Sequence, residues 1–332
     1  MPSWSLPIHQ SMGQSVLYKD PMPTTKLLSI IALTALSSTA CAVTSHPTTK
    51  ASLGTTRSAR EMMALVDQPG PIEVVTVASA DWVVPRSGVL DLDAPKAKAA
   101  KLEDRDEPIQ IFFHALRHPQ RGLFVVDSGV ERALRDAPDR AAVRGLVTKV
   151  MHLDALHIRE PLGDWLAKQP TPLAGVLLTH LHLDHIMGLP DVPRDTPIYT
   201  GPGEASASSM LNAFVRGHSD RALADKPALR ELGFQPDAAG RFAGVLDVFG
   251  DGSLWALWVP GHTPGSTAYL ARTPKGPVLL VGDTCHTRWG WDHGVAPGSF
   301  TADAEDNARS LAQLQQLVAE HPKIDVRLGH QP

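Results

Sequence analysis

The sequence predicts an α+β fold in which two β-sheets pack together and helices cover the outer faces. Three observations lead to this prediction: strand-like segments come first, a helical insert interrupts them, and further strands and a late helix follow. The strand-like segments are short, rich in β-branched and aromatic residues, and bounded by turn-forming residues, as strands are. The sequence shows no repeat at a fixed period of ~20–50 residues, so a solenoid or propeller is not indicated.

Four strand-like segments precede the insert, at 72–79, 109–116, 122–129 and 173–180. The last of these, LAGVLLTH, is an almost continuous apolar run, which suits a strand that is buried on both faces. The insert follows at 204–232, in two helix-like parts, 204–217 and 220–232. The sequence therefore predicts a helical insert between two groups of strands.

The second group of strands is predicted at 244–250, 253–261, 267–273 and 277–283. A helix is predicted over 302–320, because Leu311, Leu314 and Leu317 recur at helical spacing. A last strand is predicted at 324–330.

The composition is that of an ordinary globular protein, since 43% of the 332 residues are hydrophobic and 20% are charged. The formal net charge of -4 gives no sign of the basic face that nucleic-acid binding requires. Two cysteines, Cys41 and Cys285, allow one disulfide at most, so the chain is not a disulfide framework. Cys285 is expected to be a small buried apolar residue.

The N-terminal residues 1–41 are predicted to be a signal or targeting segment, with Met22 as an alternative start. Their apolar run, 27–36, is short of the ~20 residues that a membrane span needs, but it fits the core of a secretory signal. A short buried helix is the alternative interpretation.

Cys41 follows Ser-Thr-Ala and resembles a bacterial lipoprotein cleavage site, although Ser38 stands where that pattern usually has Leu. Cleavage by an ordinary signal peptidase near Ala40 or Ala42 stays open. Either interpretation predicts an exported protein, periplasmic or lipid-anchored to the cell envelope, with membrane contact only through an anchor at Cys41.

Residues 42–70 are predicted to be a flexible tether, because 42–60 is rich in Ser and Thr and lacks apolar periodicity. A single folded domain is predicted over 71–332. The chain is therefore expected to consist of a targeting segment, a tether and one domain.

One short stretch, LTHLHLDHIMG at 178–188, contains three closely spaced histidines and an aspartate. Side chains alternate at the end of a strand, so His180 and His182 point to the same side and can bind one metal ion together. Asp184 and His185 come one turn later, where a loop that becomes a helix would bring them beside the same point. Imidazole nitrogens and a carboxylate are ligands that zinc accepts, and iron, manganese and cobalt suit similar sites.

Three further candidates lie downstream, each just after an apolar strand: His262 in VPGHTPGS, Asp283 in LLVGDTCH and His330 in VRLGHQP. Functional sites are usually assembled on loops at such strand ends. The recurrence predicts that these side chains complete two metal sites together with the earlier cluster.

The blocks HLHLDH, GHTPGS, GDT and GH, in this order, resemble the metallo-β-lactamase-fold hydrolase superfamily from about Ile72 onward. The resemblance implies a four-layer αββα sandwich with two divalent metal ions, zinc by default, in a cleft at one edge. By residue, the resemblance assigns His180, His182 and His262 to the first metal, Asp184, His185 and His330 to the second, and Asp283 to both.

The sequence is most similar to the N-acyl homoserine lactonase branch of that superfamily. Asp283 argues against a true β-lactamase, which has cysteine or serine in that region, and the sequence has no G-x-S-x-G elbow. The resemblance implies a hydrolase in which two metal ions hold a bridging hydroxide that attacks a small lactone or ester, with Asp184 transferring a proton. The alternatives are a hydrolase of organophosphate, sulfate ester or thioester substrates, and a non-catalytic metal-binding sensor module.

One position departs from the lactonase pattern. Lactonases of this branch carry a tyrosine three residues after the bridging aspartate, where it contacts the substrate, and this sequence has His286 there. A catalytic histidine could donate a hydrogen bond or a proton at that place, and the alternative is a histidine that orients a metal ligand.

Three further predictions concern residues near the expected cleft. Trp289 and Trp291 are expected to hold an acyl or aryl part of a small-molecule substrate, or else to pack on the core. Asp127 in VVDSG is expected to order a loop rather than to bind metal. The insert 204–232 is expected to cover the cleft or to form homodimer contacts.

Overall fold

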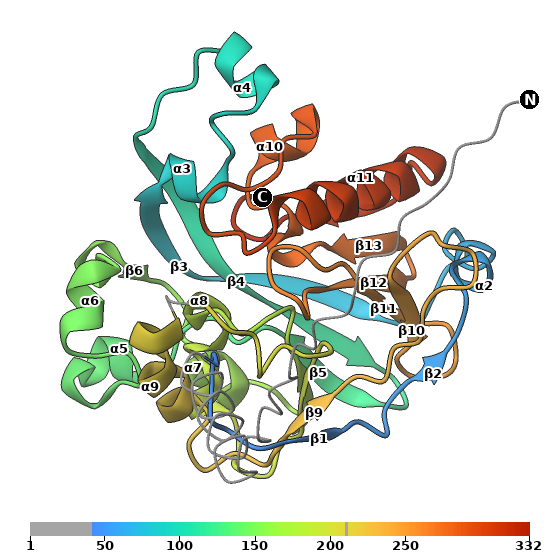
Figure 1. Ribbon diagram of the computed structural model, residues 1–332. Helices are drawn as coiled ribbons and strands as arrows, with labels where there is room; N and C mark the ends of the chain where they lie inside the picture. Colours follow the sequence, from blue (N-terminus) through green and yellow to red (C-terminus); the bar gives the residue numbers. More distant parts are fainter. Residues whose placement is uncertain (1–41, 210–211) are drawn as a thin grey trace, which may run out of the picture. The chain divides into compact units, whose positions relative to one another are not determined.

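The computed structural model describes residues 42–209 and 212–332, which form two β-sheets packed face to face with helices on their outer faces (Figure 1). This arrangement confirms the predicted αββα sandwich. The strands and helices are given below with their bounds.

The first sheet has eight strands. In spatial order they are β1 (Thr48–Lys50), β9 (Leu229–Glu231), β8 (Ile198–Thr200), β7 (Leu173–Leu177), β5 (Gly122–Val126), β4 (Asp106–His118), β3 (Glu73–Pro85) and β6 (His157–Ile158). β3 and β4 are long and antiparallel, whereas β5, β7, β8 and β9 run parallel. Val126 pairs with Leu177, so the chain leaves β5 and β7 at the same edge of the sheet.

The second sheet has six strands. In spatial order they are β14 (Asp325–Arg327), β13 (Gly276–Leu280), β12 (Thr267–Thr273), β11 (Leu254–Trp258), β10 (Gly244–Asp247) and β2 (Thr55–Thr56). All neighbours are antiparallel except β13 and β14, which run parallel. Leu280 pairs with Arg327, so the segments after β13 and β14 also leave their sheet together.

Most helices are short. In chain order they are α2 (Ala59–Met63), α3 (Arg86–Val89), α4 (Pro95–Ala99), α5 (Ala133–Asp136), α6 (Leu146–Val150), α7 (Leu162–Ala167), α8 (Leu183–Ile186), α9 (Asn212–Ala222), α10 (Arg288–His293) and α11 (Ala304–Glu320). Four 3-10 turns are η1 (Pro138–Arg140), η2 (Leu153–Ala155), η3 (Leu189–Asp191) and η4 (Gly282–Thr284). The longest helix of the described residues, α11, is preceded by the N-cap residue Asp303, whose carboxylate accepts a hydrogen bond from the Asp306 N–H (2.9 Å).

Three groups of buried apolar side chains hold these layers together. One group lies between the sheets and includes Phe124 from the first sheet and Tyr269 from the second. Another packs the first sheet against α7 and α8, and it includes Leu162. The third packs the second sheet against α2 and α11, with Met62 and Leu314 both fully buried. Each sheet thus buries both faces, as the layered fold requires.

The predicted segments agree with the main elements. Each predicted strand segment overlaps an observed strand, from β3 in the first to β14 in the last, and the predicted helix overlaps α11. The sequence did not reveal the short strands β1, β2, β6, β8 and β9. These strands have only two or three residues each, too few to show an alternating pattern.

The predicted flexible tether, residues 42–70, is wrong. Thr48 in β1 pairs with Leu229 in β9, and Thr55 in β2 pairs with Asp247 in β10, so this segment adds an edge strand to each sheet. α2 begins with a capping box in which Ser58 and Glu61 bond each other's backbone N–H groups. The Ser/Thr-rich composition led to the wrong prediction for two reasons. Threonine is β-branched and suits edge strands, and the hydroxyls of serine and threonine cap helices.

The predicted helical insert, 204–232, is only partly helical. One helix, α9, continues through Gly217, where the sequence suggested a break between two helices. The second half then ends in the strand β9. Glycine costs a helix about 1 kcal/mol, which packing against the rest of the domain can offset. Residues 210–211 of the insert lie outside the described residues.

The predicted targeting segment, 1–41, lies entirely outside the described residues, and so do Met22 and Cys41. From residue 42 onward, the described part of the chain has no helix long and apolar enough to span a membrane.

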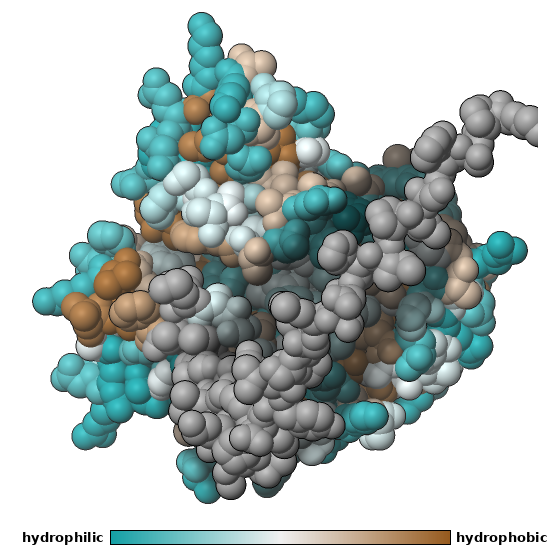
Figure 2. Space-filling view, viewed as in Figure 1, coloured by the Kyte–Doolittle hydropathy of each residue, from teal (hydrophilic) through white to brown (hydrophobic). Residues whose placement is uncertain are grey.

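Large hydrophobic side chains are exposed at five positions of the described chain: Val75, Leu146, Val150, Phe214 and Phe300. Leu146 and Val150 lie one turn apart on α6, and Figure 2 shows a hydrophobic patch over that helix. Most of the remaining coloured surface in this view is hydrophilic, as expected of an ordinary globular domain.

A buried glutamate predicts a pH dependence of stability. Burial raises the pKa of Glu131 from 4.5 to about 7, although its carboxylate accepts a hydrogen bond from the Ala142 N–H (2.7 Å). Its stabilising contribution is therefore complete below pH 4.5 and is lost as the pH rises through about 7. We expect Glu131→Gln to raise the free energy of unfolding at pH 8 relative to wild type by about 1–2 kcal/mol, after allowance for solvent screening.

Urea unfolding of both proteins at pH 5 and pH 8 checks this expectation. In the Glu131→Gln variant the amide oxygen can still accept the Ala142 hydrogen bond, so the difference between the two proteins isolates the charge. An equal difference at both pH values would contradict the assignment.

Candidate metal centre

The predicted ligands all follow strands that end at one edge of the sandwich. His180, His182, Asp184 and His185 come after β7, and the later three candidates come after β11, β13 and β14. The loop after β7 is held by the second sheet, since the Thr267 N–H and the Tyr269 hydroxyl donate to backbone carbonyls within it (2.9 and 3.0 Å). Both sheets therefore fix the position of the histidine-rich segment.

Two glycines allow Asp283 to reach the centre of this edge. Gly282 has a φ of +55°, which favours glycine, and it begins the η4 turn that carries Asp283. A Cβ on Gly329 would collide with the Asp283 carboxylate, so the segment before His330 can pass this close only as glycine. The backbone conformation thus favours glycine at Gly282 in GDT, and close contact with Asp283 requires glycine at Gly329 in LGH.

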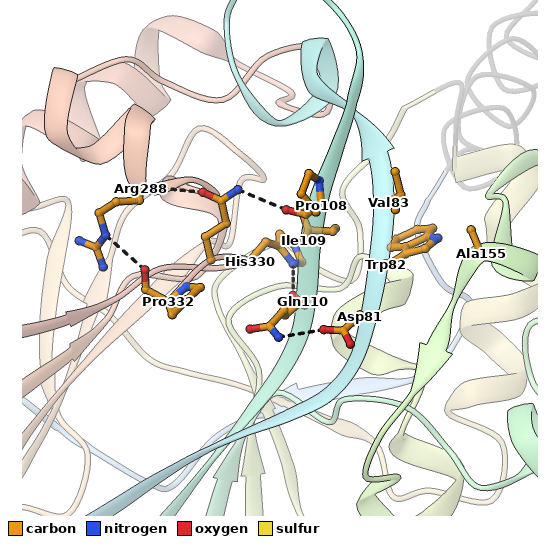
Figure 3. A pocket seen from close by; sticks show the side chains of 11 residues that line it. Asp81, Trp82, Val83, Pro108, Ile109, Gln110, Ala155, Arg288, His330 and Pro332 are labelled. Atoms are coloured by element: carbon orange, nitrogen blue, oxygen red, sulfur yellow. Dashed lines mark hydrogen bonds between the residues drawn. The ribbon is translucent and has the colours of Figure 1, made fainter.

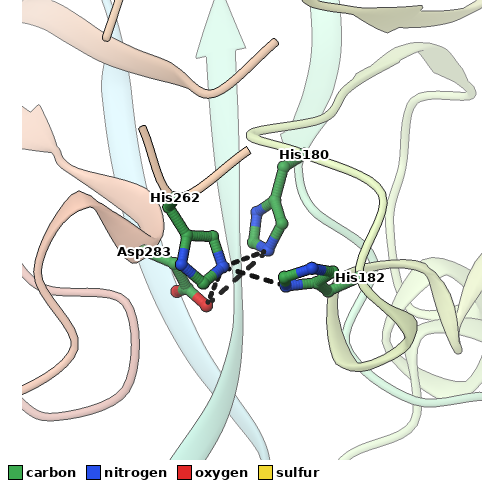
Figure 4. A group of neighbouring side chains, drawn as sticks. All are labelled: His180, His182, His262 and Asp283. Atoms are coloured by element: carbon green, nitrogen blue, oxygen red, sulfur yellow. Dashed lines mark hydrogen bonds and ion pairs between the residues drawn. The ribbon is translucent and has the colours of Figure 1, made fainter. Parts of the chain in front are cut away.

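The first group of ligand atoms comes from His180, His182, His262 and Asp283 (Figure 4). His262 Nε2 lies 3.2 Å from His180 Nε2 and 2.9 Å from His182 Nδ1. Asp283 Oδ2 lies 3.7 Å from His180 Nε2 and 3.5 Å from His262 Nε2. The four ligand atoms lie within 4.8 Å of one another.

The second group comes from Asp184, His185, Asp283 and His330 and has the same 4.8 Å limit. His330 Nε2 lies 3.2 Å from Asp184 Oδ2 and 3.3 Å from Asp283 Oδ2. His185 Nε2 lies 3.2 Å from Asp283 Oδ2. Asp283 belongs to both groups, so the structure brings all seven predicted side chains together, with this carboxylate in the middle.

The donor set fits divalent cations. Nitrogen atoms around a tetrahedral zinc ion with bonds of ~2.0–2.1 Å lie about 3.3 Å apart, close to the spacing of His262 Nε2 from His180 Nε2 (3.2 Å). Within the described residues, the buried atoms His185 Nε2 and Asp283 Oδ1 have no hydrogen-bond partner. Buried polar atoms are normally satisfied, so these two are available as ligands. The geometry therefore accommodates one ion in each group.

Neighbouring groups orient His185 and His330, the histidines of the second ligand group. The Asp127 carboxylate lies 2.8 Å from His185 Nδ1, and the Gln110 backbone carbonyl lies 2.8 Å from His330 Nδ1. Each contact leaves the Nε2 atom facing the cluster, as partners of metal-binding histidines commonly do. Asp127 has a φ of +58° and also accepts the Thr179 N–H (2.8 Å). It lies outside both groups of candidate ligands and orders the loop, as its sequence context indicated.

Burial and the central carboxylate shift the pKa values of the histidines in opposite directions. Burial lowers the pKa of His180 and His262 well below the ordinary value, which favours the neutral imidazole that binds metal. Burial also lowers the pKa of His330, but Asp283 and Asp184 outweigh this effect and raise it to about 10. The pKa of Asp283 is held well below its usual range, because the surrounding imidazoles outweigh its burial.

His286 lies against the shared carboxylate. Its Nε2 is 3.0 Å from Asp283 Oδ2, and its ring stacks on His330 with centroids 5.3 Å apart and planes within 8°. The side chain is 2% exposed. His286 is therefore in position to hold Asp283, which was one of the two roles that the sequence left open.

A cavity of about 570 Å³ opens beside the centre (Figure 3). Its lining includes His330 together with Trp82 and Ile109 from the long strands β3 and β4. Gln110 and Arg288 contribute polar groups to the same wall. Sequence reasoning missed Trp82, Ile109 and Gln110, because positions within a long strand carry no motif, and it also missed Arg288 at the start of α10.

The two tryptophans predicted to hold substrate do not line this cavity. Trp291 packs against the apolar group beneath α11, and Trp289 stacks on His293 with centroids 4.1 Å apart. The prediction that Trp289 and Trp291 hold substrate is therefore wrong for this cavity. The tryptophan that lines it is Trp82. α10 turns the two indole rings toward other neighbours, and the alternative of packing on the core holds for Trp291.

Comparison with known proteins places these features in a family. The model of the metallo-beta-lactamase superfamily matches residues 113–330. The N-acyl homoserine lactonase AttM of Azorhizobium caulinodans is 30% identical over 250 residues, which cover 74% of this chain and 91% of that protein. AttM of Agrobacterium fabrum is also 30% identical, over 254 residues and with the same shares of each chain.

Solved structures show the same fold at lower identity. A quorum-quenching N-acyl homoserine lactone lactonase matches with a TM-score of 0.56 and 18% identity, over 80% of this chain and 94% of that chain. The dizinc quorum-quenching lactonase AidC matches with a TM-score of 0.52 and 15% identity, over 85% and 92%. The family model covers well over half of the sequence, and the chain belongs to the metallo-beta-lactamase superfamily and is a hydrolase of that family.

Proposed function

We propose that this chain is a dinuclear metal-dependent hydrolase that opens a small lactone or ester, with N-acyl homoserine lactones as the first candidates. The observation that carries the proposal is the pair of four-residue groups that share Asp283. The two AttM relatives, each 30% identical over 91% of its length, are N-acyl homoserine lactonases, which supports the substrate class.

The ligand roles follow from the two groups. His180, His182 and His262 would hold one ion, Asp184, His185 and His330 the other, and Asp283 both. When bound, two divalent ions supply a nucleophilic water near neutral pH and polarise the substrate carbonyl. Zinc suits this nitrogen and oxygen donor set, and iron, manganese and cobalt suit it as well.

Asp184 is the carboxylate that we assign to proton transfer. Its side chain is 16% exposed, whereas that of Asp283 is 3% exposed, so Asp184 has better access to solvent and substrate. Burial raises its pKa, but His185 and His330 outweigh burial and lower it, which keeps the group ionised and able to accept a proton. A nearby His330 Nε2, 3.2 Å away, orients the carboxylate.

The cavity beside His330 is suited to bind an apolar part of a substrate. Its volume of about 570 Å³ lies within the ~300–1,000 Å³ that is typical of small-molecule sites. Trp82, Val83 and Ile109 give it an apolar wall that could receive an acyl chain. Gln110 and Arg288 could fix polar atoms of the same molecule.

A substrate panel tests the proposal. The purified protein, reconstituted with Zn²⁺, Mn²⁺, Fe²⁺ or Co²⁺, would be assayed with N-hexanoyl homoserine lactone, a simple γ-lactone, an aryl ester and a phosphotriester. We expect the acyl homoserine lactone to have the highest kcat/KM, by at least about 100-fold over the phosphotriester, because the metal centre and the apolar wall act together. A phosphotriester that is hydrolysed faster than every lactone would move the assignment to the organophosphate alternative.

The position of His286 predicts a separation of turnover from metal content. We expect His286→Ala to lower kcat about 10–100-fold while the protein keeps both ions, because His286 contacts Asp283 and lies outside both ligand groups. Metal analysis and kinetics on the same preparation check this. A loss of metal in parallel with activity would make His286 a ligand.

We propose in addition that the protein is exported. The apolar run at 27–36 and the small residues before Cys41 support this, and both lie outside the described residues. Mass spectrometry of the mature N-terminus is expected to show an acylated Cys41 or a new terminus near it. Intact Met1 in a cytosolic fraction would contradict export.

A further inference from the structure

We infer that Glu204 is a positioning residue that ties together the two loops carrying His180, His182 and His262. The inference rests on the proposed function, since it concerns metal binding by these three histidines. It assigns a role to a residue that no ligand pattern in the sequence singles out.

The Glu204 carboxylate bonds both loops at once. Oε1 accepts a hydrogen bond from the Leu181 N–H (2.9 Å), and Oε2 accepts one from the Gly265 N–H (2.9 Å). Leu181 is the residue between His180 and His182, and Gly265 follows His262 by three residues. One side chain thus spans two segments that lie about 80 residues apart in sequence and meet at the first ligand group.

The packing around Glu204 leaves these loops little freedom. Glu204 is 1% exposed and Leu181 is fully buried. A Cβ on Gly265 would lie 2.6 Å from Glu204 Cβ, and a Cβ on Gly201 would collide with the Gly265 carbonyl. The segment 201–204 and the Gly265 loop therefore lie in close contact, and the absent side chains at both glycines make this approach possible.

Among the described residues, the Glu204 carboxylate is the acceptor to which the Leu181 and Gly265 N–H groups donate. At the base of the loops the Thr267 N–H donates to the Thr179 carbonyl (2.9 Å), but the Leu181 and Gly265 N–H groups bond to Glu204 nearer the histidines. Without it, two buried donors would lose their acceptor, and the loops would separate or turn these N–H groups elsewhere. Either movement shifts His262 Nε2 relative to His180 and His182.

The second ligand group depends on other partners. His185 is oriented by Asp127, and His330 by the Gln110 carbonyl. The Glu204 carboxylate instead bonds the backbone at Leu181 and Gly265, on the loops of the first group. The geometry therefore points to a selective effect, in which loss of the Glu204 carboxylate weakens one ion site and spares the other.

Glu204→Gln tests this with little change of shape. The amide has one oxygen acceptor, and its NH₂ group would face the other backbone N–H, so one of the two bonds must fail. Glu131→Gln is the matched control, because Glu131 is also a buried carboxylate that accepts a backbone N–H but lies outside the ligand groups. Wild type and both variants would be loaded with Co²⁺ and dialysed against a graded series of chelator buffers, with metal per chain and visible absorption recorded.

We expect wild type and Glu131→Gln to retain two ions, while Glu204→Gln loses one ion at about 10–100-fold lower chelator strength and keeps the other. Retention of both ions as in wild type would overturn the inference. Loss of both ions together, with a lower Tm of the metal-free protein, would also overturn it, since a general loss of stability would then be the cause. If wild type itself cannot hold two ions, the proposed function fails, and that result is visible without either variant.

If Glu204→Gln does not fold, Glu204→Asp serves instead. Its shorter carboxylate keeps the charge but cannot reach both N–H groups in the present geometry. The same selective loss of one ion is expected, and equal retention of both ions would again overturn the inference.

Discussion

Removal of metal with a chelator is expected to lower kcat/KM by at least about 1,000-fold, and addition of Zn²⁺ or Co²⁺ is expected to restore it. The described chain offers no thiol alternative, because burial raises the pKa of Cys285 to about 12 and its Sγ faces the Thr287 carbonyl (3.4 Å). Cys285 is thus the buried apolar residue that the sequence predicted. The same treatment should lower the Tm, since ions that bind only the folded state stabilise it by about 3–4 kcal/mol at 100–1,000 times their Kd.

Metal analysis and lactone hydrolysis would be followed on the same samples during removal and addition. Activity should rise with the number of ions per chain and should reach its maximum at two. Full activity in protein that holds less than about one tenth of an ion per chain would exclude a metal-dependent reaction.

His262→Ala is expected to leave one ion per chain and to lower kcat/KM by about 1,000-fold. His262 Nε2 is the atom closest to the other imidazoles of the first group, 2.9 Å from His182 Nδ1 and 3.2 Å from His180 Nε2. Its removal takes away one of the four candidate ligands of the first group, so that group should hold its ion much more weakly. The second group does not contain His262, so its ion should remain.

His321→Ala is the matched control for this variant. His321 lies outside both ligand groups and pairs with Asp67 (2.8 Å) at the end of α11. Its replacement should change neither metal content nor kcat/KM by more than about twofold. Two ions and near-normal turnover in His262→Ala would remove this residue from the centre.

The ligands could be predicted from sequence because each follows an apolar strand. His180 to His185 form a local pattern, and the later three occur in short blocks bounded by glycine. Strand ends at one edge of a sandwich come together once the fold is known, and the structure does bring these side chains together. The local signal and the fold were sufficient for the candidate ligand set.

The surrounding residues could not be predicted in this way. Gln110 acts through its backbone carbonyl, which any residue at that position would supply. Trp82 lines the cavity from within β3, and Glu204 reaches two loops that are distant in sequence. Such contacts depend on three-dimensional packing, for which a single sequence has no periodic signal.

Long-range contacts without a local sequence signal also explain the errors in the predicted fold. The strand at Thr48 exists because β9 offers it a partner about 180 residues away, and its own three residues have no apolar pattern. The helix across Gly217 is held by tertiary contacts, including the bond from the Arg221 side chain to the Ala142 carbonyl (2.8 Å). Long-range pairing outweighs local propensity at both places.

The parallel pairing of β13 with β14 has a consequence for how the protein matures. His330 reaches the second ligand group only after the segment 325–327 has docked beside β13, so a nascent chain cannot complete that group before its residue 330 has left the ribosome. Under the proposed function, an ion would bind to the second group only after this docking. The ion bound there would then reflect the metal supply of the compartment in which β14 pairs with β13.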